Sequence, residues 1–215
     1  MLPQEVRNMK YNWYAFKLVA ICVVVFILQN IFTDLTDQFA LDSAYLLSRP
    51  WTIITYIFLH GSFEHLFYNM FALALFGSIL EKIIGSKKFL LTFFASGIIA
   101  GIGSVIFYTA SIGASGAIYG VMGALAVLRP RMTVYAGFVP LPMFLAVAFW
   151  AAGDLLGLFS PTDLTAHGAH LFGLIFGLIY GITLRKDYGE ILRKSKGEIS
   201  NEEFKNWEEE YMSSY

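Results

Sequence analysis

Charged residues are scarce in this chain of 215 residues, because Asp, Glu, Lys and Arg together make up only 14% of it. The segment from Phe89 to Leu128 contains none at all. Soluble domains carry about 25% charged residues, so this deficit argues against a soluble protein. The formal net charge is −1 and no basic run occurs, so we expect no nucleic-acid partner.

Cysteine is almost missing as well. Cys22 is the only one, which excludes an intramolecular disulfide. It lies inside an apolar run, where we interpret it as an inert apolar side chain. The chain also lacks an internal inverted repeat and an acidic residue at the expected bilayer midplane, two features that would favour a transporter.

What the sequence has instead is apolar, since 57% of its residues are hydrophobic and 17% are aromatic. Runs long enough to cross a bilayer need about 20 residues. The sequence therefore predicts an all-α membrane protein with one six-helix transmembrane domain over residues 1–185. The expected spans are 15–32, 64–80, 89–108, 115–128, 134–153 and 168–184. Residues 186–215 are predicted to form an acidic cytoplasmic tail, with Phe204, Trp207 and Tyr211 on one side of a helix.

Basic residues set the orientation of this six-helix arrangement. Nearly all of them fall on one side of it, and Arg49 alone falls on the other. Positive charge is enriched on the cytoplasmic side of membrane proteins. We therefore expect both termini in the cytoplasm and the long segment 33–63 partly in the outer leaflet. The basic residues on the cytoplasmic side include Lys82, Lys87, Lys88, Arg129, Arg131 and Arg185.

Two full spans do not fit between Phe89 and Leu128 without an external turn, so the fourth helix must be short and begin below the membrane surface. Helices rise about 1.5 Å per residue, which puts Ser115 about 21 Å above Arg129 at the cytoplasmic edge. By the same rise His170 lies about 22 Å above Arg185. The two polar side chains are therefore predicted at one depth.

The second span carries polar residues near the same depth. Counted from Lys82, Asn69 lies about 20 Å up and His65 about 25 Å up. Polar groups at such depth are costly unless they meet each other or water. A bond between helices that satisfies Asn69 is one interpretation, and a functional site is the other.

The stretch GASG around Ser115 has a plain interpretation, because small residues are common where membrane helices pack closely. However, two strips of glycine also favour a contact between Ser115 and His170. If they meet backbone to backbone, the Ser115 hydroxyl comes within hydrogen-bonding reach of His170. The imidazole could then take the hydroxyl proton as the serine attacks a carbonyl. The strips consist of Gly116, Gly120 and Gly123 on one helix and Gly173, Gly177 and Gly181 on the other.

A serine hydrolase often adds an acid that orients its histidine. Asp154 and Asp163 are expected in or near the external loop after the fifth span, away from His170. The sequence therefore favours a catalytic dyad, with Tyr119 stacked on the His170 ring. His65 and Asn69, four residues apart on one helix face, are candidate donors to an oxyanion.

A metal site is the competing interpretation of the histidines. His167 and His170 are spaced by three, and His60, Glu64, His65 and Asp163 could add ligands. No H-E-x-x-H motif is present, so we expect neither a metal nor another cofactor. His167 is interpreted as a water-facing residue at the mouth of a cavity.

Three segments together resemble the rhomboid family of intramembrane serine proteases. They are RPWTIITYIFLHGSFEHLFYNM from Arg49, GASGAIYGVMG from Gly113 and AHLFGLIFG from Ala169. The resemblance implies a rhomboid-like bundle in which Ser115 is the nucleophile and His170 the base. It also implies an oxyanion hole formed by His65, Asn69 and the Ser115 N–H. The supporting residues it implies are His60, Gly113, Gly116, Tyr119, Gly173 and Gly177. One departure is that Trp51 is followed by Thr52, where many members have arginine.

The function expected from these residues is hydrolysis of peptide bonds in or near transmembrane segments. The partners would be transmembrane protein substrates and the lipid bilayer, and a water-filled cavity would open to the external face. The resemblance implies substrate entry between the second and fifth helices, where Tyr68 and Trp150 are candidate gate residues. The alternative is an inactive rhomboid-like protein that binds or escorts membrane helices.

Overall fold

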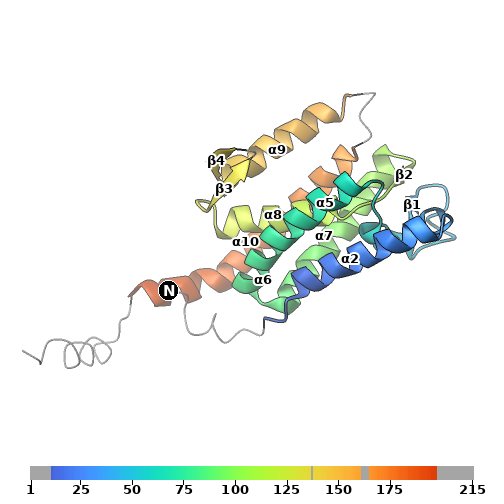
Figure 1. Cartoon of the computed structure of the whole chain (residues 1–215). Helices are drawn as coiled ribbons and strands as arrows, with labels where there is room; N and C mark the ends of the chain where they lie inside the picture. The colour runs from blue at the N-terminus through green and yellow to red at the C-terminus, as the bar shows by residue number, and fades with distance from the viewer. Residues whose placement is uncertain (1–10, 137, 161–164, 198–215) are drawn as a thin grey trace, which may run out of the picture.

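The structure is a computed structural model that describes residues 11–136, 138–160 and 165–197. It is mostly helical, and its helices form one bundle (Figure 1). The expected stripe of Phe204, Trp207 and Tyr211 lies outside the described residues. Within the described part, the last helix continues from the membrane domain into the predicted tail as far as Gly197.

The elements in chain order begin with α2 (Tyr14–Ile31), α3 (Leu35–Phe39), β1 (Leu41–Asp42), α4 (Thr52–Thr55) and η1 (Tyr56–Phe58). Next come α5 (Phe63–Ala72), η2 (Leu73–Gly77), α6 (Ser78–Ile84), α7 (Ser86–Phe107), β2 (Ala110–Ser111) and α8 (Ser115–Leu128). The chain then forms β3 (Thr133–Ala136), β4 (Val139–Pro142), α9 (Met143–Gly157) and α10 (His167–Gly197).

Among the residues that the structure describes, four stretches are long and apolar enough to cross a membrane, namely Tyr14–Ile31, Phe63–Ile84, Ser86–Phe107 and His167–Lys186. The second of them runs through α5, η2 and α6 without a break. Two apolar helices, α8 and α9, are shorter. The protein is thus an all-α membrane bundle in which the helix that begins at Ser115 is short, as the sequence predicts.

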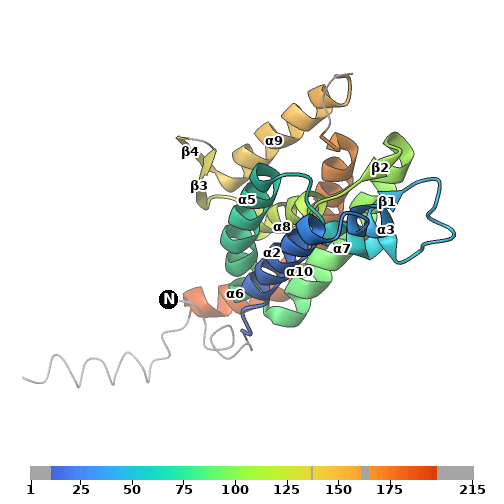
Figure 2. The same cartoon turned by 45° about the vertical axis from the view of Figure 1, so that its right-hand side comes forward.

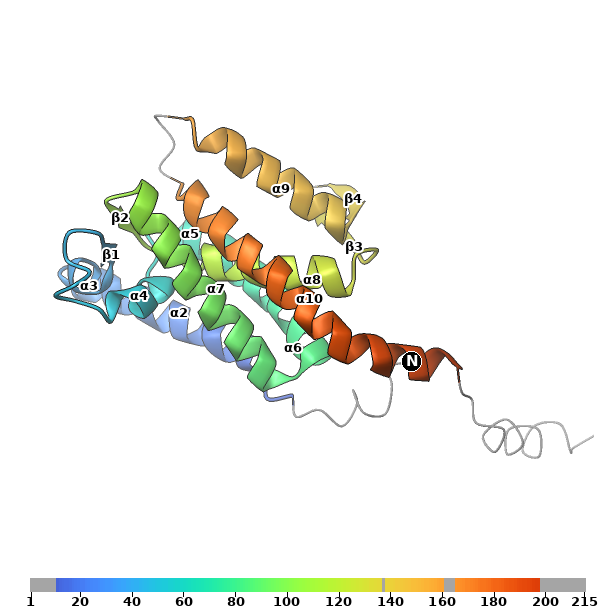
Figure 3. The same ribbon diagram turned by 180° about the vertical axis from the view of Figure 1, so that it is seen from behind.

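The short helix α8 forms the centre of the bundle, where it packs mainly on α10 and α7. Figure 3 shows α10 and α7 side by side. Glycine makes this close approach possible, because a Cβ atom on Gly173 would collide with the carbonyl oxygen of Gly116. A Cβ atom on Gly177 would likewise collide with the carbonyl oxygen of Gly120. The two glycine strips therefore meet backbone to backbone.

The predicted fifth span is the clearest difference between sequence and structure. Residues 134–153 do not form one helix, because β3 and β4 pair as an antiparallel hairpin. Pro140 and Pro142 lack the N–H that a helix interior requires, and α9 begins directly after Pro142. The helix consequently runs on to Gly157 and carries Asp154 within it.

A second pairing holds the segment before α8. β1 pairs antiparallel with β2, so that Leu41 lies opposite Ser111. This contact joins the long connection after α2 to the residues that lead into Ser115. Figure 2 shows α2 and α9 on different sides of the bundle, with α5 and α8 between them.

Candidate active site

Ser115 is the first residue of α8, and its position follows from the short length of that helix. Its Oγ lies 2.8 Å from Nε2 of His170, which lies in the first turns of α10. The backbone N–H groups of a first helical turn have no carbonyl partner within the helix. Ser115 therefore combines a hydroxyl next to an imidazole with an N–H that is free to meet a developing anion.

The His170 ring is held from several sides. Tyr119, one turn after Ser115, stacks on it with the ring centroids 4.3 Å apart and the planes 12° from parallel. Only 8% of the His170 surface is exposed. The structure thus brings the predicted serine, histidine and tyrosine together at one point between α8 and α10.

The expectation that Asp154 lies away from His170 is wrong. Oδ1 of Asp154 lies 2.9 Å from Nδ1 of His170, and both side chains are buried. The error came from the fifth span, because a helix over 134–153 leaves residue 154 in a loop. Recognising the two prolines as a break would have moved the helix toward the C-terminus and placed Asp154 on it.

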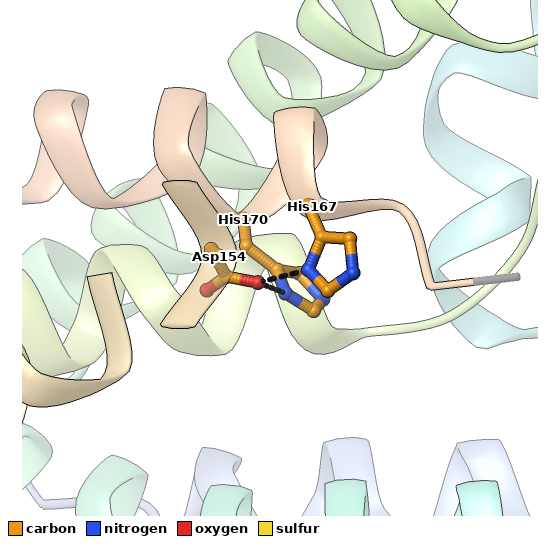
Figure 4. Close-up of side chains that lie close together, drawn as sticks. All are labelled: Asp154, His167 and His170. Carbon is orange, nitrogen blue, oxygen red and sulfur yellow. Dashed lines mark hydrogen bonds and ion pairs between the residues drawn. The ribbon is translucent and has the colours of Figure 1, made fainter. Parts of the chain in front are cut away.

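The interpretation of His167 as a water-facing residue is also wrong. His167 is buried, and its Nδ1 lies 2.7 Å from the same Oδ1 of Asp154 (Figure 4). Space for its ring exists because Gly157 has no side chain, since a Cβ atom there would collide with the imidazole. No motif in the sequence signals this pair, which only the packing of α9 on α10 brings together.

His65 and Gly113 lie on the other side of the Ser115 hydroxyl. The N–H of Gly61 is directed to Nδ1 of His65 over 3.4 Å, so the His65 ring proton belongs on Nε2. An ideal Cβ atom on Gly113 would lie 2.8 Å from Nε2 of His65 and 3.9 Å from the Ser115 Oγ. His65 Nε2 and the Ser115 Oγ therefore both lie near this position and line the same cavity.

Asn69 is buried, and its amide nitrogen donates to the carbonyl of His65, at 2.7 Å. Both residues lie in α5, so this bond differs from the hydrogen bond between helices that was one interpretation of Asn69. An amide group has two N–H donors. The second one remains available for a group bound beside Ser115.

A cavity of about 740 Å³ opens above the serine. The residues around it come from α5, the β2 segment and the starts of α8 and α10, and they include His65, Asn69, Ser115 and His170. A smaller space of about 170 Å³ lies between α5 and α8 and also reaches Ser115. Tyr68, 70% exposed, lines both of them. The other candidate gate residue, Trp150, meets the ring of Phe76.

His60 lies in the connection before α5, outside the membrane-spanning stretch. The side chain of Gln29 accepts from its backbone N–H and donates to its carbonyl, at 3.0 and 3.3 Å. Its ring meets that of His65 edge to face. Burial and the neighbouring His65 lower the pKa of His60 to about 4, although the Phe58 carbonyl opposes the shift. The imidazole is therefore neutral at physiological pH.

Asp154, His167 and His170 form a group whose possible ligand atoms all lie within 4.8 Å of one another. Their chemistry suits a divalent metal. However, a metal on the Nδ1 atoms would have to replace both ring protons that the carboxylate accepts. Both ring nitrogens meet the same oxygen, Oδ1, as a carboxylate with two N–H donors would.

Comparison with known proteins decides the family. The model described as "Rhomboid domain" matches residues 47–187, a range that holds every residue of the site. The chain belongs to the rhomboid family.

Among this rhomboid's relatives are proteins named Rhomboid protease GlpG. The one from Haemophilus influenzae is 29% identical over 177 residues, which cover 76% of this chain and 86% of the relative. The one from Yersinia pseudotuberculosis is 29% identical over 169 residues, or 75% of this chain and 59% of the relative. The one from Serratia proteamaculans is 31% identical over 170 residues, with a coverage of 75% and 59%. This rhomboid thus spans less than two thirds of the length of several relatives.

Proposed function

We propose that this protein is an intramembrane serine endopeptidase that cleaves peptide bonds in or near transmembrane segments. The observation that carries the proposal is the 2.8 Å contact between the Ser115 Oγ and Nε2 of His170 at the floor of a cavity. Membership in the rhomboid family supports it. Relatives that carry the name rhomboid protease support it further.

The chemistry follows from the positions of the groups. The Ser115 oxygen attacks the substrate carbonyl while Nε2 of His170 takes its proton. His170 then gives that proton to the leaving amine, and an ester with Ser115 remains. Water attacks this ester with His170 again as the base, which releases the new carboxyl end and restores the serine.

The negative charge on the carbonyl oxygen needs donors that are already in place. The N–H of Ser115 lies at the start of α8, and the His65 ring lines the same cavity as Ser115. The second amide proton of Asn69 would complete the set. Removal of one such donor typically lowers kcat by about 10²- to 10³-fold.

The location of the site limits the substrate. Hydrolysis consumes water, and the cavity above Ser115 supplies a route for it. A carbonyl inside a helix is engaged with its own backbone, so the substrate must unwind around the scissile bond. Helix-weakening residues such as Gly or Pro are expected there. We place the termini in the cytoplasm and the cavity on the external face, as the charge distribution indicates.

The test is cleavage of a single-span substrate by the purified protein reconstituted into vesicles. We expect activity in the natural sequence and its complete loss in both Ser115→Ala and His170→Ala. A fluorophosphonate probe should label Ser115 and leave Ser115→Ala unlabelled. Cleavage that survives either substitution would remove the mechanism.

Two other outcomes would replace the proposal. Binding of the substrate helix without cleavage, and without labelling by the probe, would favour the inactive protein that escorts membrane helices. Loss of activity in a chelator, regained with a divalent metal, would favour a metal enzyme built on Asp154, His167 and His170.

A further inference from the structure

A carboxylate that was not expected near His170 lies beside it, and the role argued for it rests on the proposed serine mechanism. Asp154 lies on α9, whereas the two histidines that it contacts lie on α10. Figure 4 shows both imidazole rings converging on one oxygen of this carboxylate. The exposed fractions of the side chains are 5% for Asp154, 11% for His167 and 10% for His170.

The arrangement determines which nitrogen of His170 carries the proton. An ionised carboxylate only accepts hydrogen bonds, so the Nδ1 atom at 2.9 Å must be the protonated one. In a neutral imidazole the other nitrogen then has a free lone pair. That nitrogen, Nε2, faces the Ser115 Oγ at 2.8 Å.

The opposite tautomer would be inactive. A proton on Nε2 would point at the serine oxygen and leave His170 unable to accept the hydroxyl proton. It would also direct the lone pair of Nδ1 at the carboxylate. The carboxylate thus selects the form of His170 that can act as a base, and its charge stabilises the imidazolium that forms when the proton moves.

His167 explains how this carboxylate is kept in a buried position. A buried charge is costly unless hydrogen bonds replace the lost water. His167 supplies a second N–H to the same oxygen, at 2.7 Å. Its ring meets that of His170 edge to face, with the ring centroids 6.3 Å apart.

We propose that Asp154 is a positioning residue that holds His170 in the Nδ1–H tautomer, and that His167 holds Asp154 in place. Hydrogen bonds thus link His167 on α10 to Asp154 on α9, and Asp154 to His170 on α10. The proton taken from Ser115 stays on His170 until the leaving amine receives it, and Asp154 is not protonated.

The first test uses the natural protein and does not depend on activity. Histidine labelled with ¹⁵N gives different chemical shifts for protonated and unprotonated ring nitrogens, and His170→Ala identifies the His170 signals by their loss. We expect the proton on Nδ1 of His170 and on Nδ1 of His167. A proton on Nε2 of His170 at neutral pH would overturn the proposal, even if Ser115 is the nucleophile.

The second test separates positioning from folding. Asp154→Asn keeps the shape of the side chain without the charge, and we expect kcat to fall about 10²-fold while KM changes little. Asp34→Asn, on the exposed turn after α2, is the matched control and should keep the natural kcat. An Asp154→Asn protein that is folded by circular dichroism and fully active contradicts the proposal. If this variant does not fold, the ¹⁵N shifts of the natural protein decide.

The third test asks whether His167 acts through Asp154. His167→Ala should lower kcat, and His167→Asn, which keeps an N–H near the position of Nδ1, should restore most of it. In the Asp154→Asn background, His167→Ala should change nothing further. Equal effects of His167→Ala in both backgrounds would show that it does not act through the carboxylate. Activity of Ser115→Ala would instead refute the serine mechanism and leave the tautomer result standing.

Discussion

Gly113 shows how much of the site depends on single residues. Its φ is +123°, a backbone conformation that side chains rarely adopt. In addition, a Cβ atom there would press on the His65 ring at 2.8 Å. The glycine therefore has two roles, because it turns the chain into α8 and leaves room for the ring of His65, the proposed oxyanion donor.

We predict that Gly113→Ala lowers the free energy of unfolding by about 1–3 kcal/mol and lowers kcat by about 10²-fold or more. The strained φ causes the first effect and displacement of the His65 ring the second. Thermal unfolding and cleavage of a reconstituted substrate measure them. Gly153→Ala is the control, because a Cβ atom there meets nothing within 4 Å. Equal behaviour of the two variants would contradict this account.

His60 makes the stability depend on pH. Its pKa is about 4 in the folded protein, against an ordinary value of 6.5. Between these values the unfolded chain binds a proton that the folded protein does not, so the free energy of unfolding falls as the pH falls. The loss on going from pH 7 to pH 4 is on the order of 3 kcal/mol.

We predict that His60→Asn, which cannot titrate, removes most of this pH dependence. Denaturant unfolding of both proteins at pH 7 and pH 4.5 measures it. The natural protein should lose more stability on acidification than the variant. If the two lose the same amount, another group is responsible for the acid sensitivity.

At the scale of elements, the start of α2 is held by a buried carboxylate. Glu81 on α6 is fully buried and accepts from the backbone N–H groups of Tyr14 and Ala15, at 3.1 and 3.0 Å. The Ser86 hydroxyl donates to it as well, at 2.6 Å. A negative charge at a helix N-terminus satisfies free N–H groups and interacts favourably with the helix dipole.

We predict that Glu81→Gln lowers the free energy of unfolding by about 3 kcal/mol, because the amide keeps only one acceptor oxygen and turns an N–H donor toward the donors that the other oxygen served. Glu64→Gln makes the same chemical change on an exposed part of α5 and should cost less than about 1 kcal/mol. Thermal unfolding in one detergent compares the two. A similar small cost in both variants would mean that the Glu81 contacts contribute little.

The elements also show what the sequence could and could not predict. Counting residues from Arg129 and Arg185 predicted Ser115 and His170 at one depth, because helix rise is constant and the glycine strips meet closely. Counting failed for Asp154, since the hydrophobic run 134–153 hides a hairpin that Pro140 and Pro142 impose. The position of His167 was missed for the same reason, because its partner Asp154 was expected in a loop and not on α9.

At the scale of the whole molecule, the site belongs to no single element. Ser115 comes from α8, His170 and His167 from α10, Asp154 from α9, and His65 from α5. Figure 1 shows α9 at one edge of the bundle, where it packs on α10 and α8. A shift of α9 would move Asp154 relative to His170. The proposed role of His170 as a base therefore depends on the position of an edge helix.

The predicted orientation, with the cavity on the external face of the membrane, can be tested by cysteine labelling, because Cys22 is the single cysteine of the chain. Cys22 is fully buried, so the natural protein should not react with a maleimide that cannot cross membranes. Leu47 is 98% exposed on the connection predicted outside, and Lys87 is exposed at the start of α7, predicted inside. We expect Leu47→Cys to be labelled in intact cells and Lys87→Cys only after lysis, because basic residues stay in the cytoplasm. The reverse labelling pattern would mean that the bundle has the opposite orientation in the membrane, with the cavity above Ser115 on the cytoplasmic side.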